Sequence, residues 1–259
     1  MDDAHFRAFA EVHISHLAEP ERGRVLDRAL EARLALSRVK DDDGYGAGLR
    51  TLDDAYVKEL EGDPEFVEAF QGLDFEFSWV DPRAPIPVQV WTSTESYMLP
   101  AAPAALVRVS LPLPARAEAD VAQCGPAAFY VMSSAPQAAN FAIEVDATGS
   151  VSVRPRPHIN LVYLVLYNGR FYIRNGTHRL ACAARQGLAE IPSIVVKARD
   201  PRLIEELLLG PNGFAPAHLL AVQRAPRVDD FSGPFAMTLP MRDQRFGFVV
   251  SAQRLVVPI

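Results

Sequence analysis

The sequence predicts a mixed α/β (α+β) protein in which a helical N-terminal region is followed by a mixed sheet with flanking helices. Three observations support this fold class. Apolar residues recur every three or four positions before residue 72, which is a helical period. From Phe75 the period changes to two, as in half-buried strands. A strand, a helix and a second strand are then expected between residues 161 and 196, the order of a strand-helix-strand unit.

Residues 1–72 are expected to form the helical region. Pro20 separates two long apolar-periodic segments, and a polar residue before a new segment is a typical helix start. Asp63-Pro64-Glu65 has the strongest such signal, because Pro and an acid are both favoured in a first helical turn. The expected helices cover residues 3–18, residues 21–39, a short segment after Thr51–Asp54 that ends near Glu61, and a segment that opens at Asp63.

Short strands are expected to follow, separated by Pro and Gly. Their alternating apolar residues place them at 75–80, 86–91, 105–111, 127–132, 141–145 and 150–154. Many of the prolines of the chain lie in residues 81–126. Because Pro cannot donate a hydrogen bond to a sheet, this segment is expected to form irregular loops or edge strands.

A β-hairpin is expected at "LVYLVLY-NG-RFYIR". Asn168-Gly169 tolerates the positive φ angles of a type I′ turn, and apolar β-formers flank it on both sides. The elements expected after the hairpin are a helix over 177–186 ended by Gly187, a strand over 191–196, a helix from Asp200-Pro201 to Leu209, and an extended C-terminal segment that ends in the strand "QRLVVPI". The expected parts are therefore 1–72, 73–210 and 211–259, forming one compact unit.

The charge is divided unevenly along the chain. The net charge is −6, but residues 1–150 carry 12 Lys and Arg against 25 Asp and Glu (−13), whereas residues 151–259 carry 14 against 7 (+7). A negative net charge argues against sequence-independent binding to DNA or RNA. The basic part suits a smaller anion such as a nucleotide, although the two parts could simply neutralise each other.

Cysteine content and hydropathy indicate a cytoplasmic protein that does not enter a membrane. Cys124 and Cys182 fit no paired metal-ligand spacing, and two cysteines in a chain of 259 residues do not form a disulfide framework. The acidic N-terminus lacks the features of a signal peptide, and no apolar run approaches the roughly 20 residues of a membrane span.

The turn Asn175-Gly176-Thr177-His178-Arg179 is the candidate functional motif. A helix N-terminus carries partial positive charge and N–H groups without intrahelical acceptors, so it can receive an anion. Gly lets a phosphate approach closely, and Thr, His and Arg side chains supply hydrogen-bond donors. Arg174 precedes the turn and could add a second cation. The alternative is a structural turn whose Arg is solvated and whose His is part of the packing.

Residues 161–196, "LVYLVLYNGRFYIRNGTHRLACAARQGLAEIPSIVV", resemble the ParB/sulfiredoxin superfamily. The resemblance consists of a hairpin, Gly-x-x-Arg or Gly-x-His-Arg at a helix start, an Ala-rich helix that ends in Gly, and a following strand. Residues 75–89 could correspond to the first conserved segment of that family. The remaining segments 1–72 and 200–259 show no resemblance.

The resemblance implies that the glycine turn and its arginine hold the phosphates of a nucleoside triphosphate, ATP or CTP, with Mg²⁺. The implied binding residues are Arg174, Asn175, Gly176, Thr177, His178 and Arg179, with His178 and Arg179 as catalytic residues. Sulfiredoxins carry Cys where this chain has Thr177, so their redox chemistry is not expected. Free-serine kinases of the superfamily share Gly-x-His-Arg, which favours NTP hydrolysis or phosphoryl transfer to a small hydroxyl acceptor.

Other functions remain open from the sequence. A non-catalytic, nucleotide-responsive interaction module would share the turn and lack turnover. A ParB-like association with nucleic acid is also conceivable, but DNA binding is not expected because the downstream segment shows no helical pair. Metal ligands are not assigned, and Glu76, Asp81 and Glu144 are the acids considered for a base or metal ligand. A homo-oligomer is neither implied nor excluded.

Overall fold

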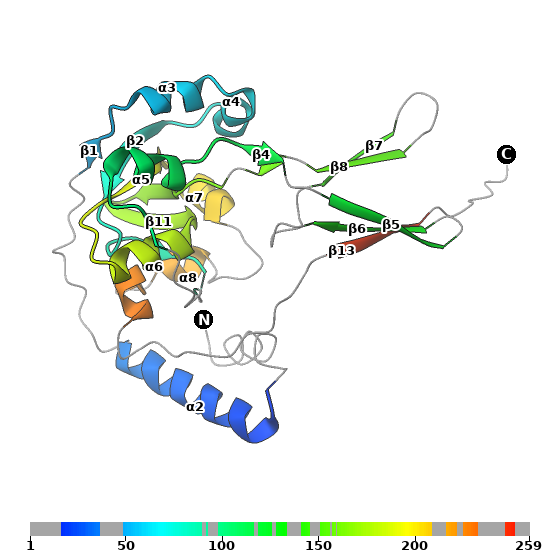
Figure 1. Cartoon of the computed structure of the whole chain (residues 1–259). Helices are drawn as coiled ribbons and strands as arrows, with labels where there is room; N and C mark the ends of the chain where they lie inside the picture. Colours follow the sequence, from blue (N-terminus) through cyan, green and yellow to red (C-terminus); the bar gives the residue numbers. More distant parts are fainter. Residues whose placement is uncertain are drawn as a thin grey trace. The chain divides into compact units, whose positions relative to one another are not determined.

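The structure, a computed structural model, describes most of the chain. The described residues are 17–36, 49–89, 92, 98–116, 119–125, 128–133, 141–145, 151–155, 157–158, 160–208, 216–221, 225–232 and 247–251. They confirm a mixed α/β fold in which helices flank a six-stranded sheet (Figure 1). No helix in these segments is both long and apolar enough to cross a membrane.

Contacts divide the chain into two compact units. One unit contains residues 1–62, 67–112 and 160–238 and includes the six-stranded sheet. The other contains residues 63–66, 113–159 and 239–259. Most of the second unit thus lies within residues 73–210, the segment in which the sequence predicts a single core.

The six-stranded sheet has the order β1-β2-β12-β10-β11-β3. The bounds are Arg50–Thr51 for β1, Phe75–Val80 for β2, Ile86–Pro87 for β3, Tyr163–Tyr167 for β10, Arg170–Asn175 for β11 and Ile191–Lys197 for β12. The β10–β12 and β11–β3 pairs are parallel and the other pairs are antiparallel. Strands far apart in the sequence therefore meet around β10, whose side chains Leu164 and Val165 are fully buried.

The predicted hairpin is confirmed by β10 and β11. Asn168 has φ of 49° and Gly169 has φ of 74°, the positive values that a type I′ turn requires. The helix α6 (Thr177–Arg185) follows at once, and Gly187, with φ of 70°, comes directly after its C-cap residue Gln186. The predicted strand-helix-strand unit is thus present as β11, α6 and β12.

The N-terminal region is largely, but not entirely, helical. The helices α2 (Glu19–Leu36), α3 (Ala55–Glu61) and α4 (Pro64–Phe70) agree with the sequence signals. Asp54 caps α3 by accepting a hydrogen bond from the N–H of Tyr56, and Asp63 caps α4 in the same way. The expectation of helix alone is wrong at Arg50–Thr51, because β1 pairs with Trp79 and Ser78 of β2. The helix expected over residues 3–18 lies outside the described residues except at its end.

The strand predicted over residues 105–111 is wrong, because this segment is the helix α5 (Pro103–Ser110). Pro103 occupies its first turn, where the absent N–H is not needed. Leu106, Val107 and Ser110 are buried and Val109 is exposed, which follows a helical and not an alternating period. Packing against β12 decides the conformation in spite of the β-branched valines.

One face of the sheet is covered by α7 (Pro201–Leu208) and α8 (Pro216–Ala221), which contact each other. Val165 of β10 and Tyr172 of β11 form a core cluster with Ile204 and Leu208 of α7 and with Leu219 of α8. The helix α7 confirms the one predicted after Asp200-Pro201. The expectation of a purely extended C-terminal segment is wrong, because it contains α8 and the 3-10 helix η1 (Val228–Phe231).

The second unit consists of small antiparallel sheets. Strands β5 (Ala119–Gly125), β6 (Ala128–Ser133) and β13 (Gly247–Ser251) form one, β7 (Phe141–Val145) and β8 (Val151–Pro155) form another, and β4 (Ala115–Arg116) pairs with β9 (Pro157–His158). The sequence predicts β6, β7 and β8 but not β5. The predicted terminal strand "QRLVVPI" lies outside the described residues.

Candidate functional site

The glycine of the candidate turn is required by both backbone angle and packing. Gly176 has φ of 94°, in the left-handed region, and is the residue from which α6 begins. A Cβ placed on Gly176 would lie 2.9 Å from Cα of Val162, closer than real Cβ contacts. Because this neighbour is backbone, it cannot yield as the end of a side chain would. The predicted sharp turn from strand to helix is confirmed (Figure 1).

The residues beside Gly176 lie in different environments. Asn175, the last residue of β11, accepts a hydrogen bond of 2.8 Å on Oδ1 from the N–H of Gly176. Thr177, the first residue of α6, is buried. Arg174 is exposed, one residue before Asn175. Among the predicted phosphate-binding residues, Arg174 is therefore exposed, whereas the other five are partly or fully buried.

Arg179 is buried against another helix. Arg179 as a whole residue is only 7% exposed. Nη1 donates hydrogen bonds of 3.0 Å to the carbonyls of Val109 and Ser110, and Nη2 donates one of 2.7 Å to Oδ1 of Asn160. The two carbonyls belong to the last turn of α5, which has no intrahelical donors for them. The guanidinium group thus caps the negative end of α5.

The imidazole of His178 is half-buried between α6 and the residues after β3. Nδ1 lies 3.1 Å from Oγ1 of Thr92, and Nε2 lies 3.5 Å from Nε2 of Gln89. Burial lowers the pKa of His178, and the nearby positive charges of Arg185 and Arg179 lower it further. The neutral ring is therefore favoured at neutral pH. With the amide of Gln89 as donor, Nε2 accepts and Nδ1–H donates to Thr92.

Two of the three acids that the sequence suggests as a base or metal ligand form ion pairs with basic side chains. Glu76 accepts a hydrogen bond of 2.7 Å from Nζ of Lys197, and Asp81 is held by the guanidinium of Arg83 at 2.8 Å. The side chain of Glu144 lies outside the described part of the structure. Among the described side chains, no group of three or more His, Cys, Asp or Glu could hold a metal ion.

Several residues at the site could not be recognised from the sequence. Gln89 and Thr92 contact His178 from 89 and 86 residues away, and Asn160 contacts Arg179. The sequence pattern also predicts a strand, and not a helix, at the end of α5. The sequence around a polar loop residue does not predict which distant residue it will contact, because folding of the sheet brings the two together.

Comparisons with protein-family models, curated proteins and solved structures found no match for this chain. The resemblance of residues 161–196 to the ParB/sulfiredoxin superfamily therefore stays a prediction. The nucleotide chemistry that it implies also stays a prediction.

Proposed function

We propose that the turn at residues 174–179 binds the phosphates of a nucleoside triphosphate, ATP or CTP, with Mg²⁺. The proposal is supported chiefly by the combination of an exposed cation, Arg174, with a left-handed glycine, Gly176, at the start of the nine-residue helix α6. Phosphate is favoured there by the N–H groups and partial positive charge of the first helical turn. Residues 170–185 also contain four arginines and no Asp or Glu.

The roles of the two predicted catalytic residues differ within this proposal. Arg179 positions the start of α6 by holding it to the end of α5, and its charge contributes to the positive potential of the turn. His178, whose pKa is lowered, is neutral, and its Nε2 can accept a proton from a hydroxyl acceptor or a water molecule when that group displaces the amide of Gln89. Hydrolysis of the triphosphate, or phosphoryl transfer to a small hydroxyl compound, is the proposed reaction.

Calorimetric titration of the whole protein with ATP, CTP and GTP in the presence of Mg²⁺ tests the binding. At least one nucleotide should bind, and Arg174→Ala should weaken it by about tenfold or more, since a charge-assisted bond to phosphate is lost. Arg199→Ala is the matched control, because Arg199 is an exposed arginine outside the turn. Absence of binding by all three nucleotides would overturn the proposal.

Release of inorganic phosphate separates the enzymatic proposal from a nucleotide-responsive interaction module. Binding with steady release that is reduced in His178→Gln supports catalysis. Binding without release above background supports the module, which agrees with the pairing of Glu76 with Lys197 and of Asp81 with Arg83. Association with nucleic acid is less well supported, and a gel shift at low salt, where electrostatic binding is strongest, tests it.

A further inference from the structure

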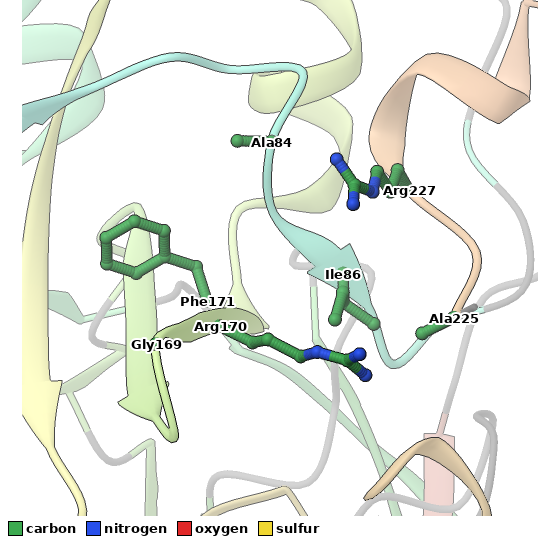
Figure 2. Close-up of a pocket in the computed structure, with 7 residues that line it drawn as sticks. All are labelled: Ala84, Ile86, Gly169, Arg170, Phe171, Ala225 and Arg227. Carbon is green, nitrogen blue, oxygen red and sulfur yellow. The ribbon is translucent and has the colours of Figure 1, made fainter. Parts of the chain in front are cut away.

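A small cavity lies at the opposite end of β11 from the candidate turn. It is lined by Ala84, Ile86, Gly169, Arg170, Phe171, Ala225 and Arg227 (Figure 2). Arg170 opens β11 and Asn175 ends it. Five steps of about 3.3 Å along a strand separate the two by roughly 17 Å, so the cavity is distinct from the turn.

Two cationic side chains line this cavity, and none of the lining residues is acidic. The side chain of Arg170 extends past Ile86 (Figure 2). The side chain of Arg227 is directed toward the backbone that joins Ala84 to Ile86. The remaining lining consists of apolar side chains and Gly169. An apolar wall lowers the local dielectric constant, which strengthens hydrogen bonds between a guanidinium group and an anion.

The backbone holds both arginines on ordered elements. Arg170 follows the type I′ turn directly. The N–H of Val228 donates a hydrogen bond of 3.1 Å to the carbonyl of Pro85, next to β3. The N–H of Arg227 donates one of 2.8 Å to Oδ2 of Asp230, which fixes the start of η1. Side chains carried by fixed elements lose little freedom when a ligand binds.

The volume of the cavity, about 40 Å³, limits what it can accept. At roughly 10–15 Å³ for each water molecule, it has room for about three waters. A nucleotide or another drug-sized ligand needs several hundred Å³ and would not fit. One carboxylate or phosphate group is of suitable size, and the planar donor fork of Arg matches the oxygens of both.

We propose that this cavity is an oxyanion subsite in which Arg170 and Arg227 bind a single carboxylate or phosphate group. Gly169, one of its lining residues, is exposed at the hairpin turn. The subsite does not depend on nucleotide binding at Gly176. It would recognise one acidic group of a small molecule, or free inorganic phosphate.

The Nε–Hε resonances of the arginines, followed by NMR in the whole protein, test this subsite. Sodium phosphate and sodium acetate are added in separate titrations, with chloride keeping the ionic strength constant. Saturable shifts of Arg170 and Arg227 are expected with at least one of the two. A response to phosphate alone, to acetate alone or to both identifies the kind of acidic group that is bound.

Arg227→Gln and Arg170→Gln should each weaken the response by about tenfold or more, since each removes a charged donor. Arg199→Gln, at an exposed arginine outside the cavity, and Arg174→Ala, at the candidate nucleotide turn, should leave it unchanged. If Arg227→Gln fails to fold, Arg170→Gln, beside an exposed turn, provides the same measurement. The proposal is overturned if neither anion gives a saturable shift, or if the shift persists in the folded Arg170→Gln protein.

Discussion

The guanidinium group of Arg179 contacts carbonyl groups that lie 70 and 69 residues earlier in the chain. An Arg after Gly-x-x at a helix start suggests a phosphate ligand when the sequence is considered alone. In the fold, the same side chain satisfies the end of α5 and the side chain of Asn160. A motif thus specifies the donor but not its acceptor, because the acceptor is supplied by tertiary structure.

Replacing Arg179 by Ala should lower the free energy of unfolding by roughly 3 kcal/mol, because the carbonyl of Val109 and the side chain of Asn160 lose this donor and the carbonyl of Ser110 keeps only the N–H of Val162. Urea denaturation measures this change. Arg185→Ala, at an exposed arginine of the same helix, should change stability by less than about 0.5 kcal/mol. A loss below about 1 kcal/mol in Arg179→Ala would show that these contacts contribute little to stability.

Gly176→Ala and Gly187→Ala form a matched pair for separating backbone strain from steric clash. Both glycines have positive φ, but a Cβ on Gly187 meets nothing within 4 Å, whereas one on Gly176 meets Val162. Gly187→Ala should cost about 1 kcal/mol from the left-handed angle alone. Gly176→Ala should cost about 1–3 kcal/mol more from overpacking. Equal losses in thermal or urea unfolding would contradict the close approach of Val162.

Tyr163 should make stability depend on alkaline pH. Its hydroxyl is buried without a hydrogen-bond partner in the structure, and burial raises its pKa from 10.0 to about 12, an effect that Arg174 partly offsets. Below pH 10 the phenol is protonated in both states. Between pH 10 and about pH 12, Tyr163 ionises in the unfolded chain but stays protonated in the folded protein, so stability falls as pH rises.

Tyr163→Phe should remove this part of the alkaline loss, and should be neutral or slightly stabilising at neutral pH because no hydrogen bond is broken. Urea denaturation of the two proteins at neutral pH and in the interval between the two pKa values provides the comparison. An identical alkaline loss in both proteins would show that Tyr163 ionises equally easily in the folded and unfolded states.

At the scale of elements, α5 shows how local pattern and packing can disagree. Its residues Val107 and Val109 would share one face of a strand, but they lie on different faces of the helix. Val107 is 1% exposed and Val109 is 40% exposed. The exposed valine produces the apparent alternation that suggests a strand.

Val107→Ala should therefore lower the free energy of unfolding by about 2 kcal/mol, since buried apolar surface is lost. Val109→Ala should change it by less than about 0.5 kcal/mol, and the better helix propensity of Ala could offset the change. Chemical denaturation of both variants measures the difference. Comparable losses would favour the strand over the helix.

At the scale of the whole molecule, residues 113–159 leave the first unit and return to it at neighbouring points. The N–H of Val162 donates a hydrogen bond of 2.8 Å to the carbonyl of Ser110, and these residues flank the inserted segment. The six-stranded sheet and its core take no strand from it. The segment is therefore an insertion into the unit that carries the candidate turn.

A variant in which a short Gly-Ser linker replaces residues 113–159 should keep the first unit folded, because a few residues can join chain ends that lie this close. Far-UV circular dichroism and cooperative thermal unfolding check the fold, and nucleotide titration checks the candidate turn. Loss of cooperative unfolding would show that the first unit requires the inserted segment.

Local chemistry alone was sufficient to predict several elements. Asn168-Gly169 specifies the hairpin turn because both positions need positive φ, and Asp63-Pro64 specifies the start of α4 through capping. Gly176 and Gly187 likewise mark the two ends of α6. In each case the determining interactions lie within a few residues of one another, so the sequence contains the whole signal.

The sequence by itself therefore determined a mixed α/β protein with a hairpin, a glycine turn and a helix in that order. Tertiary structure alone decided that α5 is a helix, that Arg179 caps it, that Gln89 and Thr92 hold His178, and that Arg170 and Arg227 line one cavity. The physical reason is that these contacts join residues up to 89 positions apart. Only the pairing and packing of distant strands bring such residues together, and no short-range pattern records it.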